Sequence, residues 1–128
     1  MEDPAVTEII VAEDSYTDQQ LIDKLFDCDD ADWNITKASS GEEALEFMRI
    51  VLADVLITDL RMPGMGGLEF LRTVGGQYSD VPVVLITGYA NDDIAVEALR
   101  AGADSYVPKM DLVERLVETV KQDRCAGG

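Results

Sequence analysis

Five short apolar runs alternate with five helix-like patterns along the chain, and this alternation constrains the fold more than any other feature. Strands are predicted at 8–12, 33–38, 55–58, 82–87 and 105–107, and helices at about 17–27, 41–50, 66–75, 91–101 and 111–122. Strands that alternate strictly with helices form a parallel sheet with helices on both faces. The first, third and fourth strands are continuously apolar, as expected when both faces of a strand are buried. We therefore expect an α/β fold of three layers.

The second and fifth strands suit the edges of this sheet. The second, WNITKA at 33–38, is more polar, and the fifth is short and runs into Pro108. Proline and polar residues are tolerated on edge strands, because one side of the backbone is unpaired there. The strand order 2-1-3-4-5 puts both strands at an edge, and we borrow it from the flavodoxin-like folds that share this alternation. The expected fold is a three-layer (βα)5 flavodoxin-like sandwich with one parallel five-stranded sheet.

Length and charge narrow the possible functions. The 128 residues suffice for one domain, expected over 1–128, with a core at about 7–122 and a tail or the start of a linker at 123–128. The formal net charge of −16 argues against direct binding to nucleic acid or to an anionic membrane, and it favours a cation or a basic partner. The chain begins acidic and has no apolar run long enough to span a membrane, so we expect it to be cytoplasmic.

The residue types that the chain lacks exclude several kinds of chemistry. It has no histidine, which excludes a Ser-His triad, a histidine general base and histidine-ligated zinc. Cys28 and Cys125 show no metal-ligand spacing, and we interpret them as reduced bystanders. The chemistry of the chain therefore has to come from carboxylates, hydroxyls and ammonium groups.

Polar side chains gather where the predicted strands end. Glu13 and Asp14 follow the first strand, Asp59 follows the third, Thr87 ends the fourth, and Lys109 comes just after the fifth. Parallel strands have their carboxyl ends on one rim, and ligands bind where the winding direction changes, here between the first and third strands. We therefore expect the three carboxylates to converge there, with Thr87 and Lys109 beside them.

Three carboxylates this close together need positive charge beside them, or one of them is protonated. Lys109 supplies one positive charge. A hard divalent cation would supply more, and Mg²⁺ prefers one or two carboxylates, waters and a phosphoryl oxygen. A carboxylate beside Mg²⁺, a hydroxyl and an ammonium is suited to accept a phosphoryl group as the nucleophile. The pattern predicts a phosphoryl acceptor that depends on Mg²⁺, with Mn²⁺ as a substitute.

Four motifs at successive strand ends make the chain resemble the receiver domains of two-component response regulators over about residues 7–122. The motifs are AED at 12–14, DLRMPGMGG at 59–67, LITG at 85–88 and GADSYVPK at 102–109. The resemblance implies that Asp59 is the phosphoacceptor. It implies that Asp14, Asp59 and the backbone carbonyl of Arg61 bind Mg²⁺, and that Glu13 contributes directly or through water.

The resemblance also assigns roles in a conformational switch. Thr87 would hydrogen-bond the phosphoryl group, Lys109 would pair with it, and Tyr106 would change rotamer together with Thr87. The group would come from a histidine kinase or a phosphotransfer protein. The chain is not expected to be an enzyme beyond catalysing its own phosphorylation and dephosphorylation.

Phosphorylation would then change one face of the domain. This face comprises the fourth helix, the fifth strand and the fifth helix (91–101, 105–107 and 111–122), and it would bind a downstream target, an output domain or a second copy of the chain. The chain is expected to be either a stand-alone receiver or a receiver cut from a longer protein, and the thiol near the Gly-Gly end, which resembles the start of a linker, favours the second.

The chain departs from the family pattern at several places. Met110 follows Lys109 where the family usually has proline, and we expect a trans peptide bond between them. Gly66 replaces the usual Asp before the third helix, at a cost of only tenths of a kcal/mol, since glycine caps a helix nearly as well. Arg61 and Tyr89 are bulky at positions that border the path of the hydrolytic water, which predicts slow self-dephosphorylation.

Three other functions compete with a phosphorylated switch. A hydrolase of the haloacid dehalogenase type needs a second Asp two residues after the nucleophile, where this chain has Arg61. A flavin-phosphate binder needs a Ser/Thr/Gly-rich loop after the first strand, where the acidic AEDSYTD would repel a phosphate. The remaining alternative is a pseudo-receiver, a phosphorylation-independent interaction module with the same fold.

Overall fold

The computed structural model, which describes residues 6–60, 64–88 and 92–126, confirms the predicted alternation of strands and helices. The strands are β1 (Thr7–Ala12), β2 (Trp33–Ala38), β3 (Val55–Asp59), β4 (Val83–Thr87) and β5 (Ser105–Pro108). The α-helices are α1 (Tyr16–Asp27), α2 (Gly41–Ile50), α3 (Gly67–Gln77), α4 (Asp92–Ala101) and α5 (Leu112–Ala126), with a short 3-10 turn, η1 (Lys109–Asp111), before α5. The bounds of β2 and α2 are those that the sequence predicts.

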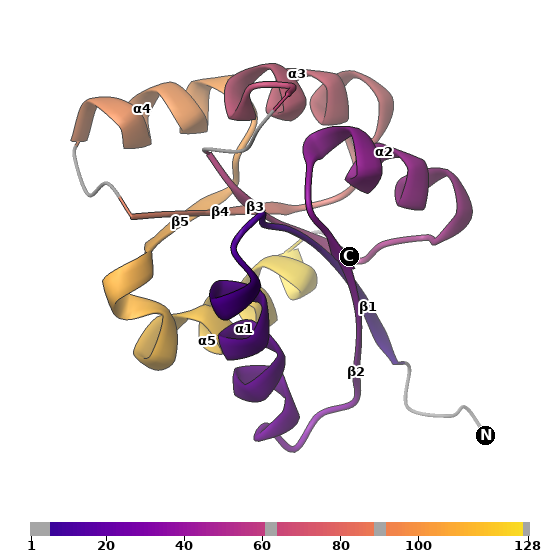
Figure 1. Cartoon of the computed structure of the whole chain (residues 1–128), viewed down its shortest axis with the longest axis vertical. Helices are drawn as coiled ribbons and strands as arrows, with labels where there is room; N and C mark the ends of the chain where they lie inside the picture. The colour runs from indigo at the N-terminus through magenta and orange to yellow at the C-terminus, as the bar shows by residue number, and fades with distance from the viewer. Residues whose placement is uncertain (1–5, 61–63, 89–91, 127–128) are drawn as a thin grey trace.

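All five strands are parallel and pair in the predicted order β2-β1-β3-β4-β5. The more polar β2 and the short β5 therefore form the edges, and the apolar β1, β3 and β4 form the centre. Helices α2, α3 and α4 cover one face of the sheet, whereas α1 and α5 cover the other (Figure 1). This is the expected three-layer (βα)5 sandwich.

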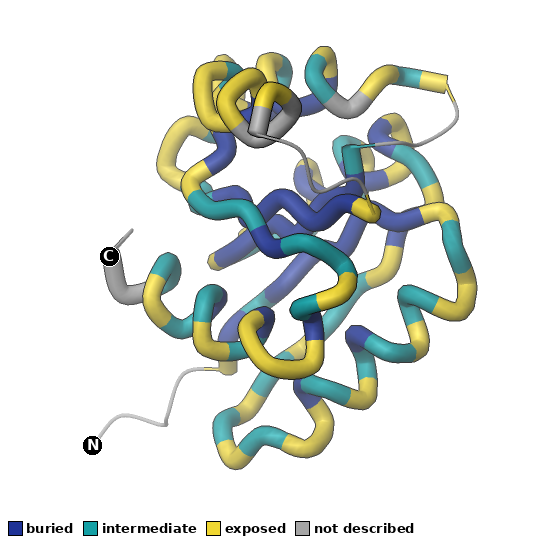
Figure 2. The backbone as a smooth tube through the Cα atoms, turned by 90° about the vertical axis from the view of Figure 1, so that its left-hand side faces the viewer, coloured by how far each residue is buried: buried dark blue, intermediate teal, exposed yellow. Residues whose placement is uncertain are grey.

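Each face of the sheet has its own hydrophobic core, because successive residues of a strand point to opposite faces. In β3, Val55 and Ile57 pack against residues of α1 and α5, such as Ile22 and Leu116. Leu56, between them, packs into the other core, under α2, α3 and α4. The central strands are buried along their length, while the outer surfaces of the helices are exposed (Figure 2).

Side chains at the first turns explain where the first two helices begin. The Ser15 hydroxyl accepts a hydrogen bond from the backbone N–H of Asp18 at 3.3 Å and caps α1. The Ser40 hydroxyl accepts from the Glu43 N–H at 3.1 Å, while a Glu43 carboxylate oxygen accepts from the N–H of Ser39 at 2.6 Å. These caps satisfy N–H groups that have no partner within the helix.

The last helix is longer than the sequence predicts. It continues to Ala126, so the prediction that this helix ends at about 122 is wrong, while the prediction of a tail or the start of a linker at 123–128 stays a prediction. Lys121 pairs with Asp29 at 2.9 Å, and Arg124 donates to the Thr7 hydroxyl at 2.7 Å. These contacts hold the last turns of α5 against the amino end of the sheet.

Two further predictions about local structure are confirmed. The described residues contain no cis peptide bond, so the bond between Lys109 and Met110 is trans. Gly66 occupies the N-cap of α3 in an extended conformation, without a side-chain cap. None of the helices in the described residues combines the length and the apolar character needed to cross a membrane.

Candidate functional site

The carboxyl ends of β1 and β3 bring three acids together as the sequence predicts. Glu13 and Asp14 directly follow β1, and Asp59 is the last residue of β3, which lies beside β1 in the sheet. One carboxylate oxygen from each of the three lies within 4.8 Å of the others. The sheet topology alone produces this convergence, because parallel neighbours end on the same rim.

The three acids differ in burial. Glu13 is completely buried and Asp59 is only 5% exposed, whereas Asp14 is exposed to solvent. A carboxylate oxygen of Glu13 accepts a hydrogen bond from the backbone N–H of Ser15 at 3.0 Å, which orients the side chain under the start of α1. The cluster is thus buried on one side and open to solvent on the side of Asp14.

Lys109 supplies the positive charge of this cluster. Its ammonium nitrogen lies 2.9 Å from Oε1 of Glu13 and 3.0 Å from Oδ2 of Asp59. Lys109 begins η1 directly after the edge strand β5, and its side chain reaches Asp59 at the end of β3. The structure therefore confirms that Lys109 lies beside the carboxylates.

A fourth acid, Asp18, contacts the same ammonium and was missed by the sequence reasoning. Its Oδ2 lies 2.7 Å from Nζ of Lys109, which is the shortest of the three ion pairs of the lysine. Asp18 stands four residues after Asp14, in the first turn of α1. The only local signal for Asp18 is its place in the first turn of the helix that begins at this rim, and that signal does not identify Lys109 as its partner. The acidic site is hereafter the set Glu13, Asp14, Asp18, Asp59 and Lys109.

The crowding of charges shifts the pKa values of two groups. Burial raises the pKa of Glu13 to about 7, and the negative charge of Asp59 adds to this, although Lys109 and the Ser15 N–H oppose it. Burial alone would lower the pKa of Lys109, but its contacts with Asp18, Glu13 and Asp59 raise it well above the ordinary lysine value. Near neutral pH, Lys109 is therefore charged and Glu13 is partly protonated.

Thr87 lies at the end of the strand next to Asp59, Tyr106 lies on the edge strand beyond it, and both face the side of the sheet away from α1. Thr87 is buried at the end of β4, where its predecessor Ile86 pairs with Asp59. Tyr106 pairs with Leu85 across β4 and β5 and packs against the core under α2, α3 and α4. Because Leu85 and Thr87 are two residues apart, Thr87 and Tyr106 face the same helical layer.

Two predicted residues, Arg61 and Tyr89, lie outside the described residues. The structure therefore tests neither the Arg61 carbonyl as a metal ligand nor the role of the two side chains in dephosphorylation. The loop is described again from Gly64, whose φ of 81° favours glycine. The neighbouring N–H of Met65 donates to a carboxylate oxygen of Glu42 at 3.0 Å and so connects the loop to α2.

The composition of the acidic site suits a hard divalent cation. Glu13, Asp14 and Asp59 offer only carboxylate oxygens, which are the ligands that Mg²⁺ and similar ions prefer. The acidic site holds four carboxyl groups and one ammonium, which contacts three of them, so these described residues carry an excess of negative charge. These residues could hold a metal ion.

Comparison with known proteins identifies the family. The model of the response regulator receiver domain matches residues 9–121. The chain is 33% identical over 92 residues to the C4-dicarboxylate transport transcriptional regulatory protein DctD of Rhizobium meliloti, which covers 72% of the chain and 20% of DctD. It is 44% identical over 70 residues to the transcriptional regulatory protein FixJ of the same species, which covers 55% of the chain and 34% of FixJ. The chain thus spans at most about a third of these relatives.

Solved structures agree with this assignment over almost the full length. A response regulator receiver domain protein from Clostridium thermocellum superposes with a TM-score of 0.85 at 28% identity, covering 94% of this chain and 96% of that one. The chemotaxis protein CheY4 of Vibrio cholerae gives a TM-score of 0.84 at 27% identity, covering 93% and 99%.

Proposed function

This chain belongs to the response regulator receiver domain family, and we propose that it accepts a phosphoryl group from a phosphohistidine donor onto Asp59 in a Mg²⁺-dependent reaction. The observation that supports this most is the position of Asp59, nearly buried, among Glu13, Asp14 and Lys109. A nucleophilic carboxylate beside an ammonium and a place for a divalent cation has what phosphoryl transfer requires.

Three residues of the acidic site would hold the metal ion. Asp14 and Asp59 would bind Mg²⁺, or Mn²⁺ in its place, and Glu13 would bind directly or through water. The backbone carbonyl of Arg61 is the proposed fourth ligand. When bound, the ion supplies positive charge to the oxygens of the transferred group.

Three side chains would have separate roles in the transfer of the phosphoryl group. A carboxylate oxygen of Asp59 forms a bond to phosphorus while the bond from phosphorus to the histidine nitrogen of the donor breaks, and the donor keeps that electron pair. Lys109 stabilises the negative oxygens of the transferred group from its position 3.0 Å from Asp59. The Thr87 hydroxyl would donate a hydrogen bond to one of those oxygens. The chain acts on no substrate other than itself in this scheme.

The same event would operate a switch. Thr87 and Tyr106 face one helical layer and lie on neighbouring strands, so a movement of Thr87 toward the phosphoryl group changes the space available to Tyr106. The face formed by α4, β5 and α5 would change with it and bind a target, an output domain or a second copy of the chain. Such a change is a shift between two populated states.

The donor and the output follow from the family rather than from the geometry. DctD and FixJ are named transcriptional regulatory proteins, and the chain matches only a part of each. We infer that a histidine kinase or phosphotransfer protein is the donor, and that a downstream target or output domain receives the signal. The bulk of Arg61 and Tyr89 predicts slow self-dephosphorylation, which Arg61→Ala and Tyr89→Ala would accelerate in a measurement of phosphoryl lifetime.

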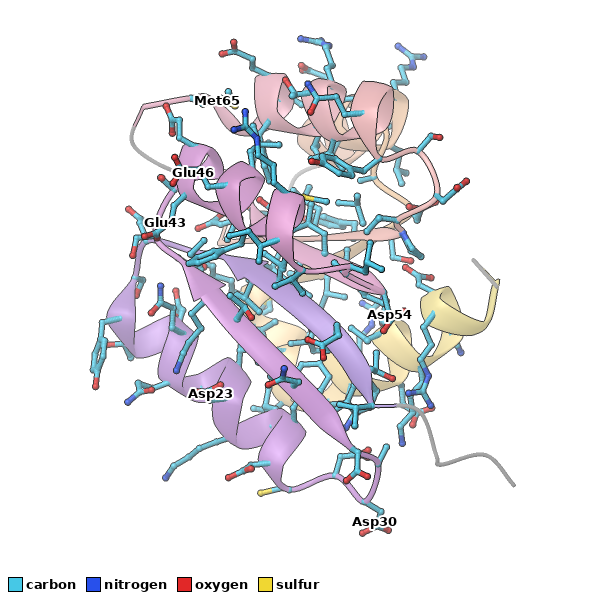
Figure 3. The ribbon with its side chains drawn as sticks, turned by 90° about the vertical axis from the view of Figure 1, so that its right-hand side faces the viewer. Asp23, Asp30, Glu43, Glu46, Asp54 and Met65 are labelled. Atoms are coloured by element: carbon cyan, nitrogen blue, oxygen red, sulfur yellow. The ribbon has the colours of Figure 1, made fainter. Side chains whose placement is uncertain are left out.

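The test is intact-mass spectrometry after incubation with Mg²⁺ and acetyl phosphate. We expect the mass of one phosphoryl group on the wild type, and none on Asp59→Asn or in the presence of a chelator. Asp30→Asn is the matched control, since Asp30 is exposed and precedes the amino end of β2. Figure 3 shows it far from Glu43, which lies in the first turn of α2, near the carboxyl end of β2. A folded wild type that gains no mass from acetyl phosphate or from a phosphorylated histidine kinase would favour the pseudo-receiver instead.

A further inference from the structure

Asp18 is the one carboxylate of the acidic site that the proposed reaction does not use. It is neither the acceptor nor a proposed metal ligand, yet its ion pair with Lys109 is the shortest that the lysine makes, at 2.7 Å. The two residues are 91 positions apart in the chain and lie on different elements, α1 and η1. The pairing is therefore a product of the fold and needs an explanation of its own.

The geometry of Lys109 shows why Asp18 matters for a phosphoryl group. An ammonium has three N–H donors, and Lys109 has three carboxylate neighbours within 3.0 Å, one each from Glu13, Asp18 and Asp59. The contacts with Asp18 and Asp59 are hydrogen bonds, and the contact with Glu13 is an ion pair. An oxygen of a phosphoryl group on Asp59 has to share or displace one of these interactions to reach the ammonium.

Asp18 is the neighbour that Lys109 releases most easily. Its side chain is 27% exposed, compared with 7% for Asp59 and 0% for Glu13. A carboxylate that is exposed regains hydration when its partner leaves, whereas a buried one does not. Asp18 also keeps its negative charge close to the phosphoryl group after the lysine has turned away.

We propose that Asp18 is a positioning residue that holds Lys109 in the resting site, strengthens binding of the divalent cation and opposes retention of the phosphoryl group. This inference rests on the proposed function of Asp59. Its physical basis is charge: Asp18 adds one negative charge beside a site that first takes up a cation and then takes up additional negative charge.

The test compares Asp18→Asn with the wild type in two titrations. Binding of Mg²⁺ is measured by calorimetry, and binding of beryllium fluoride, a mimic of the phosphoryl group, is measured at saturating Mg²⁺. We expect the Kd for Mg²⁺ to rise about fivefold and the Kd for beryllium fluoride to fall about fivefold, as for one partly exposed charge. Opposite changes distinguish this role from a structural one, because a damaged site would lose affinity for both probes.

Two matched variants control for folding and for net charge. Asp18→Glu keeps the charge within reach of Lys109 and should return both affinities toward the wild-type values. Asp27→Asn removes one negative charge from the exposed, far end of the same helix and should leave both unchanged. The cap of α1 survives all three substitutions, because Ser15 accepts from the backbone N–H of residue 18 and not from its side chain.

The outcomes separate this inference from the proposed function. If wild type binds both probes and Asp18→Asn binds them equally well, or binds both more weakly, Asp18 has no positioning role and the phosphoryl site stands. If the wild type binds no beryllium fluoride in the presence of Mg²⁺, the proposed function fails and the inference fails with it.

Discussion

At the amino end of the sheet one carboxylate accepts from three donors, whereas at the carboxyl end, within the described residues, four carboxyl groups lie near one ammonium. Asp29 accepts hydrogen bonds from the ammonium of Lys121 at 2.9 Å, the backbone N–H of Ala31 at 3.0 Å and the indole N–H of Trp33 at 3.0 Å. These donors, Lys121 first, lower the pKa of Asp29 to about 2. In the acidic site the pKa of Glu13 is instead raised to about 7.

The difference shows how to tell a structural acid from a ligand-binding acid. The Asp29 carboxylate is fully satisfied by the protein itself, so it joins the start of β2 to α5 and needs nothing more. The acidic site is left with excess negative charge after Lys109 has been counted, which a bound cation would reduce. Three substitutions and one change of pH test this contrast.

Removing the lysine should cost the most stability. Lys109→Met keeps the length of the side chain but leaves Glu13, Asp18 and Asp59 without their ammonium. We expect the free energy of unfolding to fall by about 2 kcal/mol at pH 8 in a chelator, less than for a fully buried ion pair because Lys109 and Asp18 are partly exposed. Urea denaturation measures this, and added Mg²⁺ should recover part of the loss. An unchanged urea midpoint would show that the acids repel one another little.

The raised pKa of Glu13 predicts a pH dependence of the opposite sign to that of an ordinary acid. The folded form binds the proton more tightly than the unfolded form, so the stabilisation is present at low pH and is lost as the pH rises through about 7. We expect a loss of about 1 kcal/mol between pH 6 and 8 without metal. The chain has no histidine to mask this window. Because the charge of Asp59 contributes to the shift, Asp59→Asn should flatten the dependence.

Weakening the ion pair between Asp29 and Lys121 should lower the stability of the fold without changing metal binding. Asp29→Asn weakens the contact with Lys121, and we expect a smaller fall in the urea midpoint than for Lys109→Met, with an unchanged Kd for Mg²⁺. The sign of the pH dependence is also reversed. Since the pKa of Asp29 is lowered to about 2, its stabilising effect is fully present when the pH is above the pKa of an ordinary aspartate. It is lost as the pH falls through about 2. A change in Mg²⁺ affinity would mean that the two ends of the sheet are coupled.

The smallest effect is expected at Arg124. Its guanidinium lies 4.8 Å from the ring centroid of Trp33, and it donates to the Thr7 hydroxyl at 2.7 Å. We expect Arg124→Gln to cost about 0.5 kcal/mol, the size of an exposed cation–π contact. Thermal unfolding would report it, with Lys24→Gln on the exposed face of α1 as the control.

Local patterns were sufficient for most of the fold and for the centre of the site. Continuous apolar runs predict the central strands, and serine caps predict where helices begin. Once these strands form a parallel sheet, Glu13, Asp14 and Asp59 necessarily lie on one rim. The contacts that the sequence did not reveal are long-range ion pairs, such as Asp18 with Lys109 and Asp29 with Lys121, which are 91 and 92 residues apart. No local rule selects one lysine for one aspartate at that distance.

The end of α5 was mispredicted for the same reason. After Val120 the apolar stripe of the helix stops, and the letters KQDRCA give no sign that the helix goes on. The helix continues because Lys121 and Arg124 find partners on the α1–β2 connection and on β1. Tertiary contacts therefore decide where this helix ends.

The division of the core into two layers, one on each face of the sheet, has a consequence for how the domain can evolve. Val55 and Ile57 of β3 belong to the layer of α1 and α5, whereas Tyr106 packs into the layer of α2, α3 and α4. Asp59 follows Ile57 by two residues and so belongs to the first layer, whereas the rotamer of Tyr106 is set in the second. Substitutions that change the packing around Tyr106 can therefore alter which partners the domain binds without touching the residues that accept the phosphoryl group.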